Sequence, residues 1–174
     1  MDTFVDRVFR AAKLDVHLYE EVEADRTALG QSMLVVVLSS IAGGLGNLRE
    51  IGLSGLFVGI VILLIGWYVW AYIVYFIGTR ILPEPQTRAD HGELLRTIGF
   101  SSSPGIIRAL GIFPGLASLV VPVATLWMLV AMVIAVRQAL DYSGTLRAVG
   151  VCLIGWIAQA LFVLVLFAVC SRPA

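Results

Sequence analysis

The feature that most constrains this chain is an apolar run from Leu53 to Gly78, which contains no charged residue. A helix needs about 20 apolar residues to cross the hydrocarbon core of a bilayer, so this run predicts a membrane-spanning helix. Similar runs cover Gln31–Leu48, Gly115–Val136 and Ala148–Val169. The whole chain is 59% hydrophobic and 14% charged, whereas soluble domains average roughly 45–50% and 25%. We therefore predict an all-α fold, a polytopic membrane helix bundle rather than a soluble domain with an anchor.

A further segment, Leu94–Leu110, is largely apolar, but it contains Arg96 and Arg108 and is interrupted by Ser-Ser-Ser-Pro-Gly at 101–105. Backbone groups freed by such a break must be satisfied by serine hydroxyls, water or neighbouring protein, because lipid offers no partner. The segment is either a short, broken span inside the bundle or a re-entrant hairpin. The positive-inside rule places the N-terminus in the cytoplasm in both cases, so it does not decide between them.

Residues 1–30 precede the first apolar run and are charged and amphipathic. Apolar side chains recur at helical spacing over 4–12, which predicts a helix lying in the membrane interface. The acidic piece that follows either binds a cation or a basic partner or forms a solvated helix face. His17 and Glu21 have an i, i+4 spacing that suits metal ligands, but no second His or Cys lies nearby, and we assign no metal site. We divide the chain into a cytoplasmic N-terminal helix (1–30) and a transmembrane domain (31–174).

The sequence lacks the motifs that are typical of several functional classes. The chain has no GxSxG, HExxH, P-loop or dinucleotide-binding motif, so we predict no enzymatic activity, no catalytic residue and no cofactor. Its 12 basic residues balance 12 acidic ones, and no basic cluster with aromatic residues predicts nucleic-acid binding. Cys152 and Cys170 would lie about 27 Å apart along one helix, too far for a disulfide within the chain.

Local patterns add three expectations. Asp90 is placed to cap a helix that begins at His91, with a carboxylate in its first turn. Glu93 and Arg96 are spaced i, i+3 and are expected to pair. Gly55 and Gly59 form a GxxxG motif, which marks either a dimer face or close packing inside the bundle.

The chain contains FVDRVFRAAKLDVHLYEEVEAD, GTRILPEPQTRADHGELLRTIGFSSSPGIIRALG and WMLVAMVIAVRQALDYSGTLRAVGVCLIGW. Together these stretches resemble bacterial members of the Yip1-domain family of small integral membrane proteins. The resemblance implies five transmembrane helices, the third short and broken, with a cytoplasmic N-terminus in the bacterial cytoplasmic membrane. Eukaryotic relatives carry an Asp-Leu-Tyr-Gly-Pro signature and act with Rab GTPases in vesicle traffic. That signature is absent here, so the trafficking role is not carried over, and the resemblance brings no catalytic residue.

We predict a non-enzymatic module that organises the membrane or binds lipid or protein. The expected partners are the lipid bilayer, other membrane proteins and a second copy of the chain. The alternative is a small-solute or lipid transporter that works as an oligomer through the broken central helix, although the clear spans lack the acidic or lysine side chains expected of ion coupling. The candidate contacts are Glu20, Glu21, Glu23, Arg88, Asp90, Glu93, Arg96, Ser101, Ser102, Ser103, Pro104 and Gln159.

Overall fold

Helices account for all of the regular secondary structure in the described residues, which confirms the all-α prediction. The computed structural model describes residues 3–46, 48–113 and 115–170. The main helices are α1 (Phe4–Ala12), α2 (Val16–Ala24), α3 (Leu29–Leu45), α4 (Leu48–Phe76), α5 (His91–Phe100), the 3-10 helix η3 (Ser103–Ile112), α6 (Ala117–Ala139) and α7 (Thr145–Cys170). Two short pieces, η1 (Arg26–Ala28) and the π-helical η2 (Ile77–Ile81), precede α3 and follow α4.

Within the described residues, three helical stretches are long and apolar enough to cross a membrane, namely Arg26–Leu45, Ile51–Ile81 and Ala117–Ala139. A shorter apolar stretch covers Thr145–Leu161 in α7. Large apolar side chains are exposed along α4 and α6, among them Leu53, Phe57 and Leu126. Exposed apolar surface on this scale is expected where lipid replaces water as the solvent. The structure therefore supports a multi-pass membrane protein.

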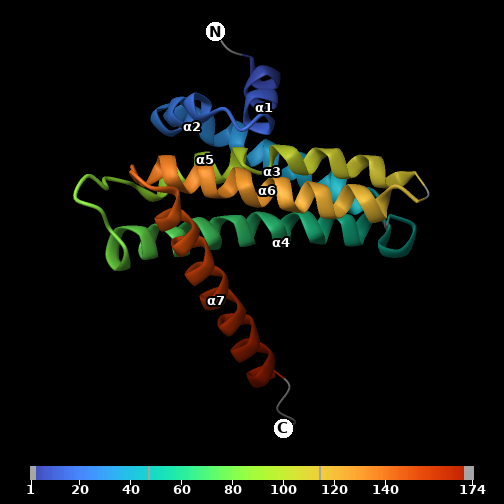
Figure 1. The fold of residues 1–174 in the computed structure, drawn as a ribbon. Helices are drawn as coiled ribbons and strands as arrows, with labels where there is room; N and C mark the ends of the chain where they lie inside the picture. Colours follow the sequence, from blue (N-terminus) through green and yellow to red (C-terminus); the bar gives the residue numbers. More distant parts are fainter. Residues whose placement is uncertain (1–2, 47, 114, 171–174) are drawn as a thin grey trace.

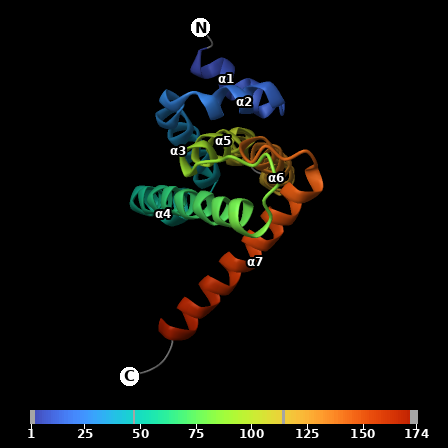
Figure 2. The ribbon, with the colours of Figure 1, turned by 90° about the vertical axis from the view of Figure 1, so that its left-hand side faces the viewer.

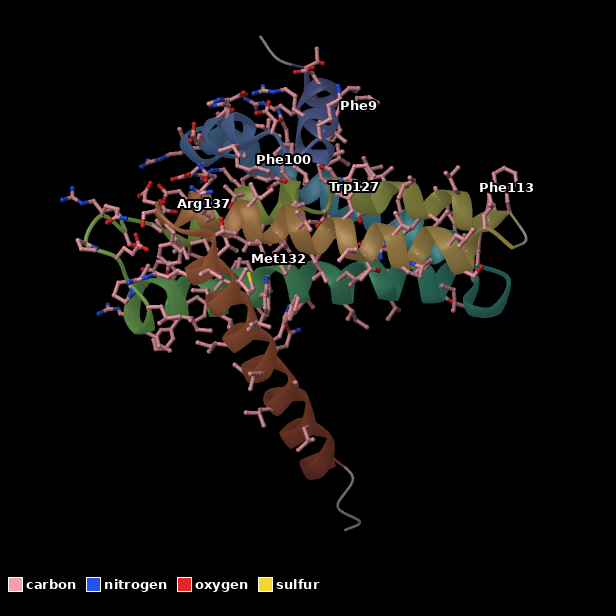
Figure 3. All side chains as sticks on the ribbon, in the orientation of Figure 1. Phe9, Phe100, Phe113, Trp127, Met132 and Arg137 are labelled. Carbon is pink, nitrogen blue, oxygen red and sulfur yellow. The ribbon has the colours of Figure 1, made fainter. Side chains whose placement is uncertain are left out.

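The bundle consists of α3, α4, α6 and the α5–η3 segment, which lie side by side (Figure 1). The α5–η3 segment contacts both α3 and α6, and α4 packs on α3 and α5. Figure 2 shows α1 and α2 on one side of this bundle and α4 on the other. The first part of α7 packs on α4 and α6, and the rest diverges from the bundle. We call the end of the bundle that holds Arg137 the α2 end, and the end that holds Phe113 the far end (Figure 3).

The interrupted segment runs along the bundle and does not turn back. Figure 3 places Phe100 between the two ends and Phe113 at the far end. The ten residues of α5 and the ten of η3 extend about 15 Å and about 20 Å respectively, given the rise of each helix type. The segment therefore follows the bundle from α5 to the far end without folding back.

Glycines at the break allow its backbone to pack closely against α3. A Cβ on Gly99 would lie 2.6 Å from Ser32 Cβ, and one on Gly105 would lie 2.7 Å from Met128 Sδ and would also overlap Ser39 Oγ. These glycines let the turn and the start of η3 pack directly against the neighbouring helices. Pro104 stands in the first turn of η3, where its missing N–H costs no hydrogen bond.

Residues 4–24 form two packed helices rather than the single N-terminal helix expected from the sequence. The chain reverses at Leu14, which has a φ of 63°. Arg7 and Arg10 of α1 then reach Glu21 of α2, at 2.7 and 2.8 Å. Buried side chains from α1 and α2 join Phe100 and neighbouring bundle residues in one apolar cluster. This unit is therefore attached to the bundle through its own core.

Two smaller expectations concern glycine and cysteine. A Cβ on Gly59 would meet nothing within 4 Å, and one on Gly55 would meet only Ile51 of the same helix. The GxxxG motif therefore does not mediate packing inside this bundle.

Cys152 is a free, buried thiol, and the side chain of Cys170 lies outside the described ones.

Candidate functional site

The start of α5 is fixed by a capping box. Asp90 Oδ1 accepts a hydrogen bond from Glu93 N at 2.8 Å, and Glu93 Oε2 accepts one from Asp90 N at 2.7 Å. This reciprocal pair satisfies two backbone donors of the first turn. The predicted cap is confirmed, and both carboxylates have a structural role at this helix terminus.

Arg96 faces α2 instead of Glu93. Its Nε donates to Val22 O at 2.9 Å and to Glu23 O at 3.2 Å, and Nη2 also donates to Glu23 O. The side chain is buried. The predicted Glu93–Arg96 pair is therefore wrong, because the guanidinium instead satisfies carbonyls at the C-terminus of α2, where the helix dipole favours a cation. Arg96 clamps the N-terminal helices to the bundle.

A surface groove of about 820 Å³ lies between α2, α5, α6 and the loops at the α2 end. Four carboxylates line it, and we call it the acidic groove. These are Glu20, Glu23, Glu93 and Asp141. The one cation among the lining residues is Arg137, whose guanidinium donates to Tyr142 O and Ser143 O in the α6–α7 turn.

The electrostatics of the acidic groove are visible at Glu23. Its pKa is raised to about 7, first by burial and then by the negative charges of Asp141 and Glu93, against an opposing effect of Arg96. Burial and two neighbouring carboxylates thus disfavour the charged form of Glu23 more than Arg96 favours it. Adding positive charge to this groove would therefore be favourable.

The other predicted docking residues lie elsewhere. Glu21 binds Arg7 and Arg10, and its pKa is lowered despite burial because both guanidinium groups donate hydrogen bonds to it. Arg88 is exposed and does not line the acidic groove. Of the candidate contacts, Glu20, Glu23 and Glu93 line the acidic groove.

Sequence reasoning missed the contribution of the α6–α7 turn to the acidic groove. Gln138 Nε2 donates to Glu20 Oε1 at 2.9 Å, a contact between residues 118 positions apart. Asp141 has a φ of 53°, in the left-handed region where Asp is enriched. The only sequence signal was a carboxylate in a short loop between two apolar runs, which does not indicate its distant neighbours.

The turn is held in place by the loop before α5. Tyr142 Oη donates to Leu82 O at 2.7 Å, and Glu84 Oε2 accepts from Ser143 N and Oγ. Arg147 reaches Glu84 Oε1 at 3.2 Å. These contacts fix one wall of the acidic groove.

A second site lies inside the bundle, where the third segment breaks. It is a cavity of about 400 Å³, which we call the helix-break cavity. Ser101, Ser102 and Gln159, all predicted contacts, line it together with Arg108. The polar lining residues absent from the predicted contacts are Arg108, Ser39, Ser40 and Thr125.

Ser103 and Pro104 are buried in the break and do not line this cavity. Ser103 Oγ donates to Phe100 O and Ser101 Oγ donates to Ile98 O, each at 2.7 Å. Serine hydroxyls thus satisfy carbonyl groups at the interruption, as the sequence predicts.

Metal binding finds no support in the described residues, which contain no group of three or more His, Cys, Asp or Glu side chains able to hold an ion. His17 Nδ1 lies 3.4 Å from Glu20 Oε2 at an exposed position.

An all-helical bundle with several long apolar helices and a polar break in its interior defines a multi-pass membrane protein. The chain belongs to the Yip1 domain family, whose domain model matches residues 18–167. The match extends from α2 into α7 and confirms the family resemblance of the sequence. No curated protein and no solved structure matches the chain.

Proposed function

We propose that this chain is a non-enzymatic membrane protein that crosses the bilayer five times and docks a basic segment of a partner protein in the acidic groove. The α2 end faces the cytoplasm in this proposal, because it carries most of the basic residues outside the spans. The α5–η3 segment is the third crossing. The resemblance to bacterial relatives supports a location in the bacterial cytoplasmic membrane.

The observation that carries the docking proposal is the lining of the groove, where four carboxylates stand against one cation among the described residues. The raised pKa of Glu23, caused by burial and then by neighbouring carboxylates, agrees with it. The carboxylates come from α2, α5 and the α6–α7 turn, so the folded chain is required to assemble them. A lysine- or arginine-rich segment supplies several positive charges at such spacing. Charge complementarity of this kind mainly steers and orients a partner.

The test uses purified protein in nanodiscs of phosphatidylcholine and a fluorescent peptide of alternating lysine and glycine. We expect Glu20→Lys combined with Asp141→Lys to reduce peptide binding at least about tenfold, because each reversal replaces attraction by repulsion. Asp6→Lys is the matched control, since Asp6 is exposed on α1 and does not line the groove. Equal binding by all three proteins would contradict docking in the groove.

Transport is the second candidate, and the helix-break cavity favours it. Non-helical backbone and polar side chains line many substrate sites of transporters, and Ser102 and Gln159 line this cavity. Solute or lipid flux into proteoliposomes should then fall in Ser102→Leu. Flux equal to that of empty liposomes for both proteins would eliminate transport.

A further inference from the structure

The helix-break cavity lies at the level of the middle of the long helices and opens toward lipid. Its lining residues on α6 run from Thr125 to Met132, around the centre of that helix. The exposed side chains of Leu63 on α4 and Trp156 on α7 belong to the same lining, so the cavity opens on the apolar surface of the protein. A ligand that enters there comes from the hydrocarbon of the bilayer. Its polar part is therefore uncharged, because a charge in the hydrocarbon is costly.

Three polar side chains of the lining have hydrogen-bonding capacity that the described residues leave unused. The amide of Gln159 and the hydroxyl of Ser102 have no hydrogen-bond partner within the described part of the chain. Arg108 donates from Nε to Gly105 O at 3.1 Å and from Nη2 to Ser39 O and Oγ at 3.1 and 2.9 Å, which leaves Nη1. Each of the three side chains carries an N–H or O–H donor. The complementary ligand group is an uncharged hydrogen-bond acceptor.

Aromatic rings and thioether sulfurs form much of the wall. Trp67, Trp70 and Trp156 line the cavity, and the ring centroids of Trp70 and Trp156 lie 6.3 Å apart. The indole Nε1 of Trp70 is buried without a hydrogen-bond partner in the described structure, so Trp70 offers the cavity its ring only. Met128 and Met132 complete this part of the wall. Aromatic rings and polarisable sulfur favour contact with another flat ring.

Gly66 on α4 keeps part of the cavity open. It is among the lining residues, and a Cβ at this position would meet nothing within 4 Å. A large side chain at residue 66 would therefore occupy the cavity without displacing a neighbour. The cavity volume of about 400 Å³ is within the usual range of small-ligand sites.

We infer that the helix-break cavity binds a membrane quinone, which is a lipid-soluble molecule whose polar end is an uncharged ring with carbonyl oxygens. The carbonyl oxygens accept hydrogen bonds from Gln159, Ser102 and Nη1 of Arg108, and the ring packs against the tryptophan wall. The apolar tail leaves between Leu63 and Trp156 into the bilayer. The inference concerns binding and includes no electron transfer. It is independent of docking in the acidic groove.

The test measures photo-crosslinking of an azido-ubiquinone to the protein in phosphatidylcholine nanodiscs, in competition with decylubiquinone or decylbenzene. Decylbenzene keeps a ring and the alkyl tail but has no carbonyl. We expect saturable crosslinking to the wild type, and decylubiquinone should compete at least about tenfold better than decylbenzene, since the hydrogen bonds are lost with the carbonyls.

Variants locate the site. Gly66→Phe fills the cavity and should reduce crosslinking at least about tenfold. Arg108→Met should weaken the binding of decylubiquinone roughly tenfold and Gln159→Leu several-fold, because a charged donor contributes more than a neutral one. Ser54→Leu is the control, since Ser54 is exposed on α4 and does not line the cavity. Its crosslinking should equal that of the wild type.

Each other result overturns a defined part of the inference. Crosslinking that does not saturate would leave the cavity to water or acyl chains, and equal competition by decylbenzene would overturn recognition of the carbonyls. A loss in Ser54→Leu as large as that in Gly66→Phe would move the ligand to the outer surface of the bundle. If Arg108→Met or Gln159→Leu fails to fold, Gly66→Phe decides, because it removes no polar contact. Unchanged crosslinking of Gly66→Phe would contradict the site.

Discussion

Arg96 and Arg108 lie on the same broken segment, and both donate to backbone carbonyls, but their surroundings differ. Arg96 meets the C-terminal carbonyls of α2 and has the carboxyl group of Glu23 nearby, whose pKa its charge affects. Arg108 donates hydrogen bonds to uncharged acceptors, Gly105 O and the carbonyl and hydroxyl of Ser39. Arg96 thus holds α2 to the bundle, whereas no acidic side chain is among the described residues that line the cavity around Arg108. Position in the sequence did not reveal this difference.

The largest effect is expected from Arg96→Ala. It leaves the α2 carbonyls without their donors and should lower the free energy of unfolding by about 3 kcal/mol, given the strength of charged hydrogen bonds. Limited trypsin digestion should then release α1 and α2 by cleavage at Arg26. Arg96→Lys should retain part of the stability. A variant as stable and as resistant as the wild type would show that Arg96 does not clamp these helices.

The next effect concerns the packing that surrounds Arg108. Gly105→Ala places a Cβ against Met128 Sδ, 2.7 Å away, and against Ser39, which should cost about 2 kcal/mol of stability through overpacking. Gly59→Ala is the matched control, because its Cβ meets nothing within 4 Å. It should be neutral or stabilising, since alanine favours helix. Similar losses in both variants would contradict close packing at the break.

A smaller effect is expected from Glu23→Gln, and it depends on pH. The folded pKa of about 7 lies above 4.5, the ordinary value of a glutamate side chain, so the wild type loses stability as pH rises from the lower value through the higher one. Glu23→Gln removes this loss and should gain about 1 kcal/mol at pH 8, with no gain at pH 4. Thermal unfolding at the two pH values measures the difference. A gain that is equal at both would show that charge repulsion is not its cause.

The smallest effect on stability is expected from Arg108→Met. Arg108 is half-buried, and replacing a desolvated charge by an apolar side chain of similar length is often neutral, so the free energy of unfolding in lipid-free detergent should change by less than about 1 kcal/mol. This outcome contrasts directly with Arg96→Ala. A loss as large as that of Arg96→Ala would give the two arginines the same structural role.

The sequence predicts those features that depend on neighbouring residues. Long apolar runs identify the spans because bilayer thickness sets their length. The cap at Asp90 and the interruption after Phe100 are also local, and both are correctly predicted. The family resemblance adds the number and order of the helices as an expectation.

The rest depends on contacts between distant segments. Arg96 binds a carbonyl 74 positions away, so the helical spacing to Glu93 suggested the wrong partner. Gln138 and Asp141 join the acidic groove only because α6 ends beside α2. Trp70 belongs to an aromatic cluster that the sequence associates equally well with a membrane interface, and only the structure shows its unpaired N–H.

The central claim is that the broken segment crosses the bilayer between Arg88 at the α2 end and Phe113 at the far end. A direct test places single cysteines at these positions, in a chain with Cys152→Ala and Cys170→Ala, and labels intact cells with a membrane-impermeant maleimide. The account predicts labelling of Phe113→Cys in intact cells, and of Arg88→Cys only after lysis. Labelling of both cysteines under the same condition would place them on one side of the membrane and contradict the crossing.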